Sequence, residues 1–516
     1  MKRLIILLLC VFVLGGCVKA DNVYNVKVPE DNNLYEVAEI KELSDRIKKD
    51  DYESIRYGVG VYEKFAIDFL RKTIETDSNL IVSPYSLYEA LAILANAANN
   101  NTRKELESAM GLTVNDMNNF LYEENYQWGS SKQSANGLWL DADKGLNLNQ
   151  DFVNTINEYY GEDTIKQFSF KDKGLIQKVN DWAKEKSDGA FDNVLNDGDV
   201  DSSSIMLIIN ALATGDKWDF QFNPDDTYPQ AFNCYDGSIK NTDMMHQQLL
   251  GYWHADNATG FVKRLENGVQ VIGILPPEGI DVYSYINSMP SDIFTKMIES
   301  EVDYDNIQNS SQWGCTYEEH LTNLSFPKFN YENELDLSVA LKKMGLKNIF
   351  DYTQSDFSNL ADGNKDIVNQ LYVQKVKQKA LIEVDEEKVR AAAVTVMPMG
   401  LGGDGCMVSK THYYDVVFDR PFIFALYEYG SGPLFIGVVT DLGQDVKDAK
   451  GQLENIAGKI NIRNNPSTKA DVVGSIEKGQ KTFYFETKDA EGYTWYRIGD
   501  NKWIADKNGE WLKKIS

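Results

Sequence analysis

Few side chains in this 516-residue chain stand at spacings that suit catalysis or metal binding. Three cysteines follow Cys17, and they can neither all pair within one chain nor form a set with metal-ligand spacing. The histidines are scattered, without a pair at i and i+4. We therefore expect no metal site and no cofactor, and we expect buried, inert thiols at Cys234 and Cys315. The remaining cysteine is Cys406, and the four histidines are His246, His254, His320 and His412.

Cys17 stands in a context that predicts a modification. Two basic residues precede an apolar run, Leu4 to Leu14, and two glycines then lead to Cys17. The run is too short to span a bilayer, and its basic start is typical of an export signal. The pattern resembles a bacterial lipobox, which implies removal of residues 1–16 and lipidation of Cys17, so that the protein is exported and held at the outer face of the membrane. An ordinary cleaved signal peptide with an incidental cysteine is the alternative.

A third segment whose composition is unusual lies between Glu386 and Phe418. The residues up to Val396 are mostly small or β-branched, and Met397 to Gly405 is rich in glycine. By periodicity alone the first part is either strand or helix, whereas the glycines predict an exposed, mobile loop that runs on to Phe418. Composition by itself indicates only a surface loop here.

Charge divides the chain into parts. The formal net charge is −26 and the pI is about 4.6, which argues against nucleic-acid binding because phosphates would be repelled. From Gly451 onward, 11 Lys and Arg stand against 9 Asp and Glu, a net charge of +2, so the acidic excess lies upstream. We expect a leader (1–16), a lipidated acidic spacer (17–51), a main domain (52–442), a linker (443–452) and a small C-terminal domain (453–516).

The main domain mixes long strands with separate helices, without regular alternation, which indicates an α+β fold. A Ser83-Pro84 start signal precedes the clearest helix, Leu87 to Ala98. The other predicted helices are 175–186, 285–299 and 335–344, and the predicted strands are 79–82, 205–210, 269–275, 371–376, 381–384, 416–418 and 434–439.

Several stretches in order along the main domain resemble the serpin family. They begin with Asn79 to Ser86, which matches a strand and the helix that follows it, and they extend to about Asp441. Each stretch alone is weakly specific for the family, but the full set in this order is highly specific. The others are Asn136 to Trp139, Val179 to Trp182, Ile209 to Leu212 with Gly215 to Trp218, Leu324 to Phe329, Arg420 to Phe424 and Pro433 to Gly437.

The resemblance implies a serpin fold: a large central mixed sheet, further sheets, about eight to nine helices and an exposed reactive loop. It also implies a suicide inhibitor of serine peptidases, or of cysteine peptidases, and not an enzyme. The peptidase attacks the loop and forms an acyl-enzyme, and the freed arm then inserts into the central sheet as an extra strand. The target peptidase is thus the expected partner.

The family register places the hinge of the loop at Glu386 and its inserting arm after it. Val389, Ala391, Ala393 and Thr395 would point into the core, and none is charged. Lys388 and Val389 depart from the family, which usually has glycine and then threonine or serine. A stiffer hinge would favour the alternative of a non-inhibitory serpin that acts as a surface binding protein. The hinge residues are Glu386, Glu387, Lys388, Val389, Ala391, Ala392 and Ala393.

Two further sets of site residues follow from the resemblance. Ser83, Ser86 and Asn210 match the family's polar cluster under the central sheet, Gln378 replaces the usual histidine there, and Trp218 matches the upper end of the sheet or is simply a core tryptophan. The scissile bond is Gly402–Gly403 when counted from the hinge, but Lys410–Thr411 when counted back from Arg420. Lys410 would suit trypsin-like enzymes, whereas Met399, Leu401 or Met407 would suit enzymes with apolar pockets. Cys406 lies in the same window as an exposed thiol.

The C-terminal segment resembles bacterial SH3-like domains. Short apolar runs are broken by Gly, Asn-Pro and Asp-Asn turns, which predicts a small all-β barrel. Such domains commonly bind cell-wall peptidoglycan, and Trp495, Tyr496 and Trp503 are candidates for a binding face, with an aromatic core as the alternative. A wall-binding scaffold led by this domain is the second rival function.

Overall fold

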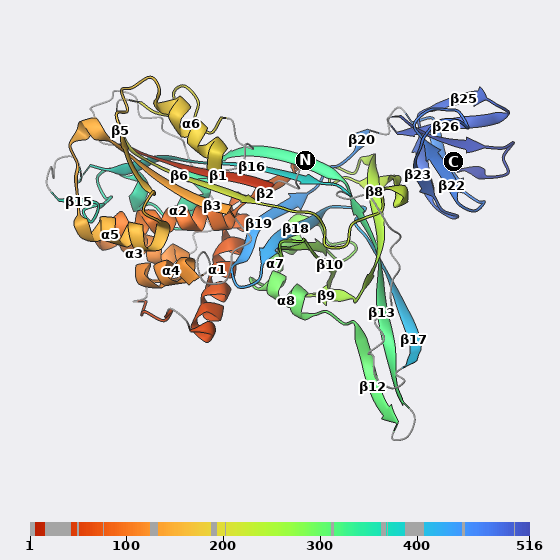
Figure 1. The fold of residues 1–516 in the computed structure, drawn as a ribbon, viewed down its shortest axis with the longest axis horizontal. Coiled ribbons are helices and arrows are strands. Elements are labelled where there is room, and N and C mark those ends of the chain that lie inside the picture. Colours follow the sequence, from red (N-terminus) through yellow and green to blue (C-terminus); the bar gives the residue numbers. More distant parts are fainter. Residues whose placement is uncertain are drawn as a thin grey trace.

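The computed structural model describes most of the chain. The described residues are 6–15, 43–48, 51–75, 77–123, 133–186, 193–201, 203–310, 314–362, 368, 370–386, 407–445, 449–499 and 501–515. They form a large α+β domain with three main sheets and a smaller all-β domain at the C-terminus (Figure 1). The fold class expected from the sequence is confirmed, and the C-terminal domain is compatible with an SH3-like barrel.

The central sheet has six strands and is mixed. Its order is β14 (Phe329–Asp336), β16 (Tyr372–Val384), β1 (Ile6–Gly15), β6 (Ser204–Thr214), β3 (Gln133–Asp141) and β5 (Ile165–Phe168). Only β3 and β5 pair in parallel. Burial alternates along most of β16, as expected for a strand with one face on the core.

Nine α-helices occur in the described part of the chain. The most important for the site is α2 (Pro84–Ala97), which begins as the sequence predicts: the Ser83 side chain accepts a hydrogen bond from the Ser86 amide, and Pro84 occupies the first turn. The others are α1 (Tyr52–Thr73), α3 (Asn100–Met110), α4 (Val114–Tyr122), α5 (Gln150–Tyr160), α6 (Leu175–Lys186), α7 (Val282–Ser288), α8 (Ile293–Glu299) and α9 (Ser338–Lys343).

A second six-stranded sheet contributes to the main hydrophobic core. Its order is β2 (Leu80–Val82), β19 (Gly432–Val439), β18 (Phe422–Glu428), β11 (Gln270–Leu275), β10 (Ala258–Arg264) and β9 (Trp253–Ala255). Every residue of β11, β18 and β19 is buried, because both faces of these strands are covered.

The third sheet carries a long arm. Its path is β12 (Tyr304–Ser310), β13 (Gly314–Pro327), β8 (Ile239–Leu250) and β20 (Gln444–Asp445), with β17 (Met407–Val417) on β13 and β7 (Thr227–Asn233) on β8. The ends of β12, β13 and β17 project together from the body (Figure 1). The short strands β4 (Asn147–Leu148) and β15 (Ala361–Asp362) pair separately.

The C-terminal domain consists of two small sheets around one core. Ile462, Ile498 and Ile504 are fully buried in it. One sheet is β24 (Lys481–Tyr484), β21 (Gly451–Asn455) and β28 (Leu512–Ile515); the other is β23 (Val472–Ile476), β22 (Ile460–Arg463), β27 (Lys502–Asp506), β26 (Tyr493–Gly499) and β25 (Glu486–Ala490).

Two sequence expectations need correction. The single helix predicted over 285–299 is split into α7 and α8, because Pro290 cannot continue a helix. The spacer predicted for 17–51 is docked at its end: residues 43–48 are non-helical, Ile47 is buried, and Asp116 accepts hydrogen bonds from the amides of Arg46 (2.8 Å) and Ile47 (2.5 Å).

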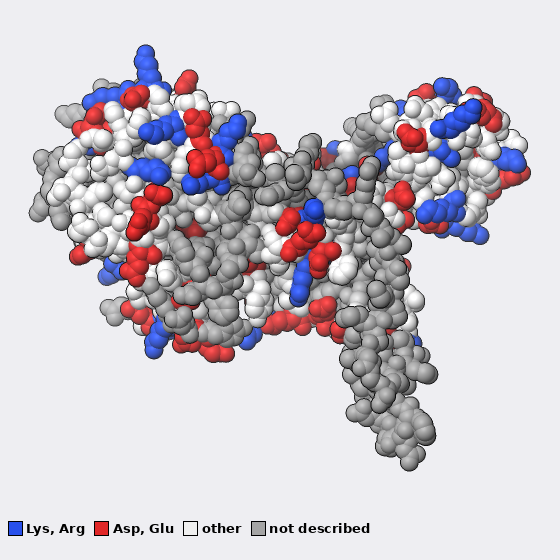
Figure 2. All heavy atoms as spheres, in the orientation of Figure 1, with Lys and Arg blue, Asp and Glu red and all other residues white. Residues whose placement is uncertain are grey.

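Described surface charges are mixed in sign. Lys and Arg side chains alternate with Asp and Glu over the face shown in Figure 2, on the main domain and on the C-terminal domain. Among the helices of the described residues, none is long and apolar enough to cross a bilayer.

Candidate functional site

The centre of the first sheet holds a strand between β6 and β16. This strand, β1, is ten residues long and antiparallel to both neighbours. Cys10 stands opposite Gln378 on one side and Asn210 on the other, and the pairing continues from Leu7 to Gly15 along β16. The sheet therefore has a central position, called the slot below, that accommodates a full strand with ladder bonds along both edges.

Polar residues predicted from the sequence lie directly at this slot. Asn210, on the β6 edge, accepts a hydrogen bond from the Ser86 hydroxyl. Gln378, on the β16 edge, accepts from the Ser83 amide at 3.1 Å and donates to the Ser83 carbonyl at 3.0 Å. All four side chains are completely buried. Gln378 thus uses both its donor and its acceptor on the backbone of one residue.

The first turn of α2 therefore connects to both edges of the slot. Ser83 contacts the β16 edge and Ser86 contacts the β6 edge. Sequence reasoning missed the other polar partners of Asn210. Its amide also donates to the Glu89 carboxylate at 2.8 Å and to Asn136 at 2.9 Å. The available signal was an acidic residue, Glu89, in the middle of an apolar helix, since a fully buried carboxylate needs partners.

Trp218 lies where the chain leaves the upper end of the sheet. It is 1% exposed, and its indole N–H donates to the Asp385 carbonyl at 2.9 Å, just beyond the end of β16. The Lys263 ammonium lies 5.4 Å from the centre of the indole ring, and burial lowers its pKa to about 7. Trp218 is therefore a core residue that also bonds the chain just beyond the end of β16. Its role at the upper end of the sheet, implied by the family resemblance, stays a prediction.

The first hinge residue has a partner that sequence reasoning missed. The Lys328 ammonium lies 2.5 Å from the Glu386 carboxylate. Lys328 joins the end of β13 to β14, next to the point where β16 ends. The other hinge residues (Glu387, Lys388, Val389, Ala391, Ala392 and Ala393), the scissile-bond candidates Met399, Leu401, Gly402 and Gly403, and the loop thiol of Cys406 lie outside the described residues.

The C-terminal end of the loop is a strand, so the prediction that the loop runs on to Phe418 is wrong. β17 pairs in parallel with β13 from Met407 to Val417. Met407, Lys410 and Thr411 therefore lie in a hydrogen-bonded strand. A peptidase binds its substrate as an unpaired extended chain, and one edge of this strand is already occupied. The geometry disfavours cleavage at Met407 or at Lys410–Thr411 and shifts the expected cut upstream.

Two histidines distant in the sequence meet at the β13–β17 pair. The rings of His320 and His412 stack at 4.7 Å, His412 lies 2.6 Å from the Glu318 carboxylate, and His320 lies 3.0 Å from the Tyr414 hydroxyl. Tyr414 stacks on Tyr252 at 3.9 Å. The hydrogen bond from His412 lowers the pKa of Glu318. Within the described ranges, no cluster of three metal-ligating side chains occurs.

The aromatic residues proposed for wall binding line the interior of the C-terminal domain. Trp495, Tyr496 and Trp503 are 1%, 6% and 8% exposed, and the Trp495 indole donates to the Ala490 carbonyl at 3.1 Å. They therefore build the core of the barrel and do not present a binding face. Cys234 is also buried, and burial raises the pKa of its thiol.

Comparison with known proteins gives a consistent result. The family model described as "Serpin (serine protease inhibitor)" matches residues 61–442. Plasminogen activator inhibitor 1 of Neovison vison is 26% identical over 75% of this chain and 91% of its own length. Leukocyte elastase inhibitor of Sus scrofa is 25% identical over 72% of this chain and 96% of its own.

A solved structure agrees with the sequence relatives. The native state of the thermophilic serpin tengpin is 26% identical, has a TM-score of 0.61, and matches 78% of this chain and 98% of its own. Serpins as a family are protease inhibitors and not catalytic enzymes. The matched residues contain β16, Gln378, Trp218 and the segment from Glu386 to Val417, and the chain therefore belongs to the serpin family.

Proposed function

We propose that this protein is a suicide inhibitor of extracellular serine peptidases, and of papain-type cysteine peptidases as a second class. The observation that carries the proposal is the slot between β6 and β16, where a ten-residue strand is bonded on both edges. Removal of residues 1–16 would leave this position for the arm of the reactive loop. A chain that turns back after Val384 runs antiparallel to β16, in the direction that β1 takes.

The chemistry belongs to the peptidase. Its hydroxyl or thiol attacks the scissile carbonyl in the loop, the peptide C–N bond breaks, and the new amine leaves on the fragment that continues into β17. The acyl-enzyme ester or thioester then travels with the arm as it enters the slot. Insertion buries Val389, Ala391, Ala393 and Thr395 without burying a charge.

The proposal places this inhibitor at a bacterial cell surface. Lipidation of Cys17 would attach it to the outer face of the membrane, and the C-terminal domain would add contacts to cell-wall peptidoglycan. Since Trp495, Tyr496 and Trp503 are buried, wall contact would use other residues of that domain.

The test is an incubation of residues 18–516 with trypsin-, chymotrypsin-, elastase-, subtilisin- and papain-like enzymes. We expect a complex that survives denaturing electrophoresis with at least one enzyme. Mass spectrometry of the released peptide should place the cut between Met399 and Cys406. Cleavage of the loop by every enzyme without a covalent complex would overturn inhibition and favour a non-inhibitory serpin. Binding to isolated cell wall without trapping would favour the wall-binding scaffold.

A further inference from the structure

The C-terminal domain is docked on the main domain through specific contacts. Tyr228 of β7 is 3% exposed and belongs to the hydrophobic core of the C-terminal domain, where its hydroxyl accepts a hydrogen bond from Gln480. The Asn241 amide donates to the Ile498 carbonyl, and the Ser475 hydroxyl donates to the Asp225 carbonyl, each at 2.9 Å. A domain that shares a core residue with its neighbour is held at a defined position.

The predicted linker contributes to this docking. Instead of being free along its whole length, its first part forms β20, which pairs with β8 at Gln444↔Asn241 and Asp445↔Lys240. Gly443 packs closely here, because a Cβ atom built on it would lie 2.3 Å from the Asn241 carbonyl oxygen. The first part of the connection between the domains is therefore an extension of the third sheet.

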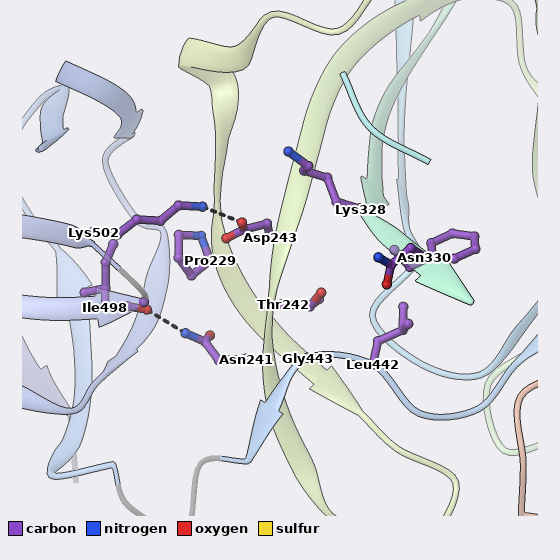
Figure 3. A pocket seen from close by; sticks show the side chains of 12 residues that line it. Pro229, Asn241, Thr242, Asp243, Lys328, Asn330, Leu442, Gly443, Ile498 and Lys502 are labelled. Atoms are coloured by element: carbon purple, nitrogen blue, oxygen red, sulfur yellow. Dashed lines mark hydrogen bonds and ion pairs between the residues drawn. The ribbon is translucent and has the colours of Figure 1, made fainter. Parts of the chain in front are cut away.

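A solvent-accessible cleft of about 350 Å³ lies between the two domains, next to the hinge of the loop (Figure 3). From the C-terminal domain, Lys502 forms an ion pair with Asp243 of β8. The Asp243 carbonyl accepts a hydrogen bond from the Lys328 amide at 2.8 Å. Lys328 then pairs with Glu386. A series of contacts through Asp243 and Lys328 thus connects Lys502 of the C-terminal domain to Glu386, the first residue of the hinge.

We propose that the docked C-terminal domain restrains the hinge, with Lys502 as the positioning residue, and that displacement of the domain speeds insertion of the arm. The physical reason is competition for one cation. Lys502 neutralises the Asp243 carboxylate, which lines the same cleft as Lys328. Without Lys502, Asp243 would compete with Glu386 for the Lys328 ammonium, and the hinge would lose part of its tether.

This proposal rests on the proposed inhibitory function, but its first test does not require inhibition. Hydrogen exchange of the peptide that contains Gln378 to Glu386 should rise roughly two- to five-fold in Lys502→Met, the factor that corresponds to weakening one partly exposed ion pair. Lys502→Arg should match the parent protein. Lys507→Met, which changes an exposed lysine elsewhere on the same domain, is the matched control.

A double variant separates competition from general loosening of the interface. Lys502→Met combined with Asp243→Asn removes the competing carboxylate, so hinge exchange should return to the parent value. Equal hinge exchange in Lys502→Met and the parent protein would overturn the proposal, and so would a double variant that exchanges as fast as Lys502→Met.

The second measurement is the rate of covalent complex formation by the same variants. It should rise by a similar factor in Lys502→Met and in no control. An unchanged rate in Lys502→Met, with hinge exchange raised, would overturn the part of the proposal that concerns insertion. If even the parent protein traps no peptidase, inhibition fails, and the exchange data still decide whether the C-terminal domain restrains the hinge.

Discussion

The two ends of the reactive loop are held in very different ways. At the N-terminal end, just beyond β16, the Trp218 indole donates a hydrogen bond to the Asp385 carbonyl, and the Lys328 ammonium forms an ion pair with Glu386. At the C-terminal end, the eleven residues of β17 lie along β13, and the stacked rings of His320 and His412 join the two strands.

This difference matches what each end would have to do in a trapping mechanism. A hydrogen bond and a partly exposed ion pair each contribute about 1 kcal/mol to stability, so neither of these two contacts is costly to break. A continuous ladder is lost only when a whole strand leaves. The two contacts named at the end that must move are thus individually weak, whereas the end that must stay is held along a whole strand.

The largest effect is expected from blocking insertion of the arm. Ala391→Arg would place a charge on the core-facing side of the inserted arm, at a cost of several kcal/mol. Covalent trapping should fall at least 100-fold, while the loop is still cleaved. The matched control is Arg390→Ala on the solvent-facing side, which should trap normally. The ratio of complex to cleaved protein on a denaturing gel measures both, and normal trapping by Ala391→Arg would contradict insertion in this register.

A second, smaller effect concerns the buried lysine beside the hinge. The unfolded chain holds a proton on Lys263 up to its ordinary pKa near 10.5, whereas the folded chain releases it near pH 7. Stability should therefore rise with pH from about 7 to 10.5, by about 5 kcal/mol from this group, and be lowest below pH 7. Urea unfolding of Lys263→Met should lack this rise. If the free energy of unfolding of Lys263→Met rose with pH as steeply as that of the parent protein, the rise would come from other groups.

The slot itself provides the third comparison. A chain that keeps residues 1–16 has β1 in the place that the arm needs, so trapping should be about tenfold slower or worse than for residues 18–516. Leu9→Pro in the leader-containing chain removes a ladder donor in the middle of β1 and should restore the rate. Equal rates for the parent chains with and without residues 1–16 would show that β1 does not compete with the arm.

The smallest effect is expected at the fixed end. Hydrogen bonding from His412 lowers the pKa of Glu318. The contact therefore stabilises the β13–β17 pair at pH values above the ordinary pKa of Glu near 4.5, and this stabilisation is lost as pH falls through the lowered pKa. Hydrogen exchange in β17 should rise by less than about twofold across that range. Glu318→Gln should remove the pH dependence, and a larger change in the variant than in the parent would contradict this assignment.

Local signals predicted much of the fold from the sequence. The Ser83-Pro84 start of α2, the apolar run of β11 and the strand over 434–439 depend on short-range patterns and were found where expected. The prediction of one helix over 285–299 is wrong because Pro290 separates α7 from α8. The placement of Ser83, Ser86, Asn210 and Gln378 around one slot could be anticipated only by resemblance, since they are spread over almost 300 residues.

The parts that could not be predicted depend on long-range contacts without a local pattern. His320 and His412 are 92 residues apart, and they come together only because β13 pairs with β17. Lys328 and Lys502 are of a residue type that is common on protein surfaces. Their roles become visible only in the structure, where Lys328 pairs with Glu386 of the hinge and Lys502 pairs with Asp243 across the two domains. The burial of Trp495 in the C-terminal domain likewise depends on long-range packing, so its local sequence could not show that it is not a ligand contact.

The amide of Gln378 has one more consequence. Its two bonds to the backbone of Ser83 involve no group that gains or loses a proton between pH 5 and 8, as an imidazole at that position would. On that edge, the separation of the sheet is therefore governed by the same contacts in mildly acidic and in neutral surroundings. A serpin with this arrangement would be suited to surroundings whose acidity fluctuates.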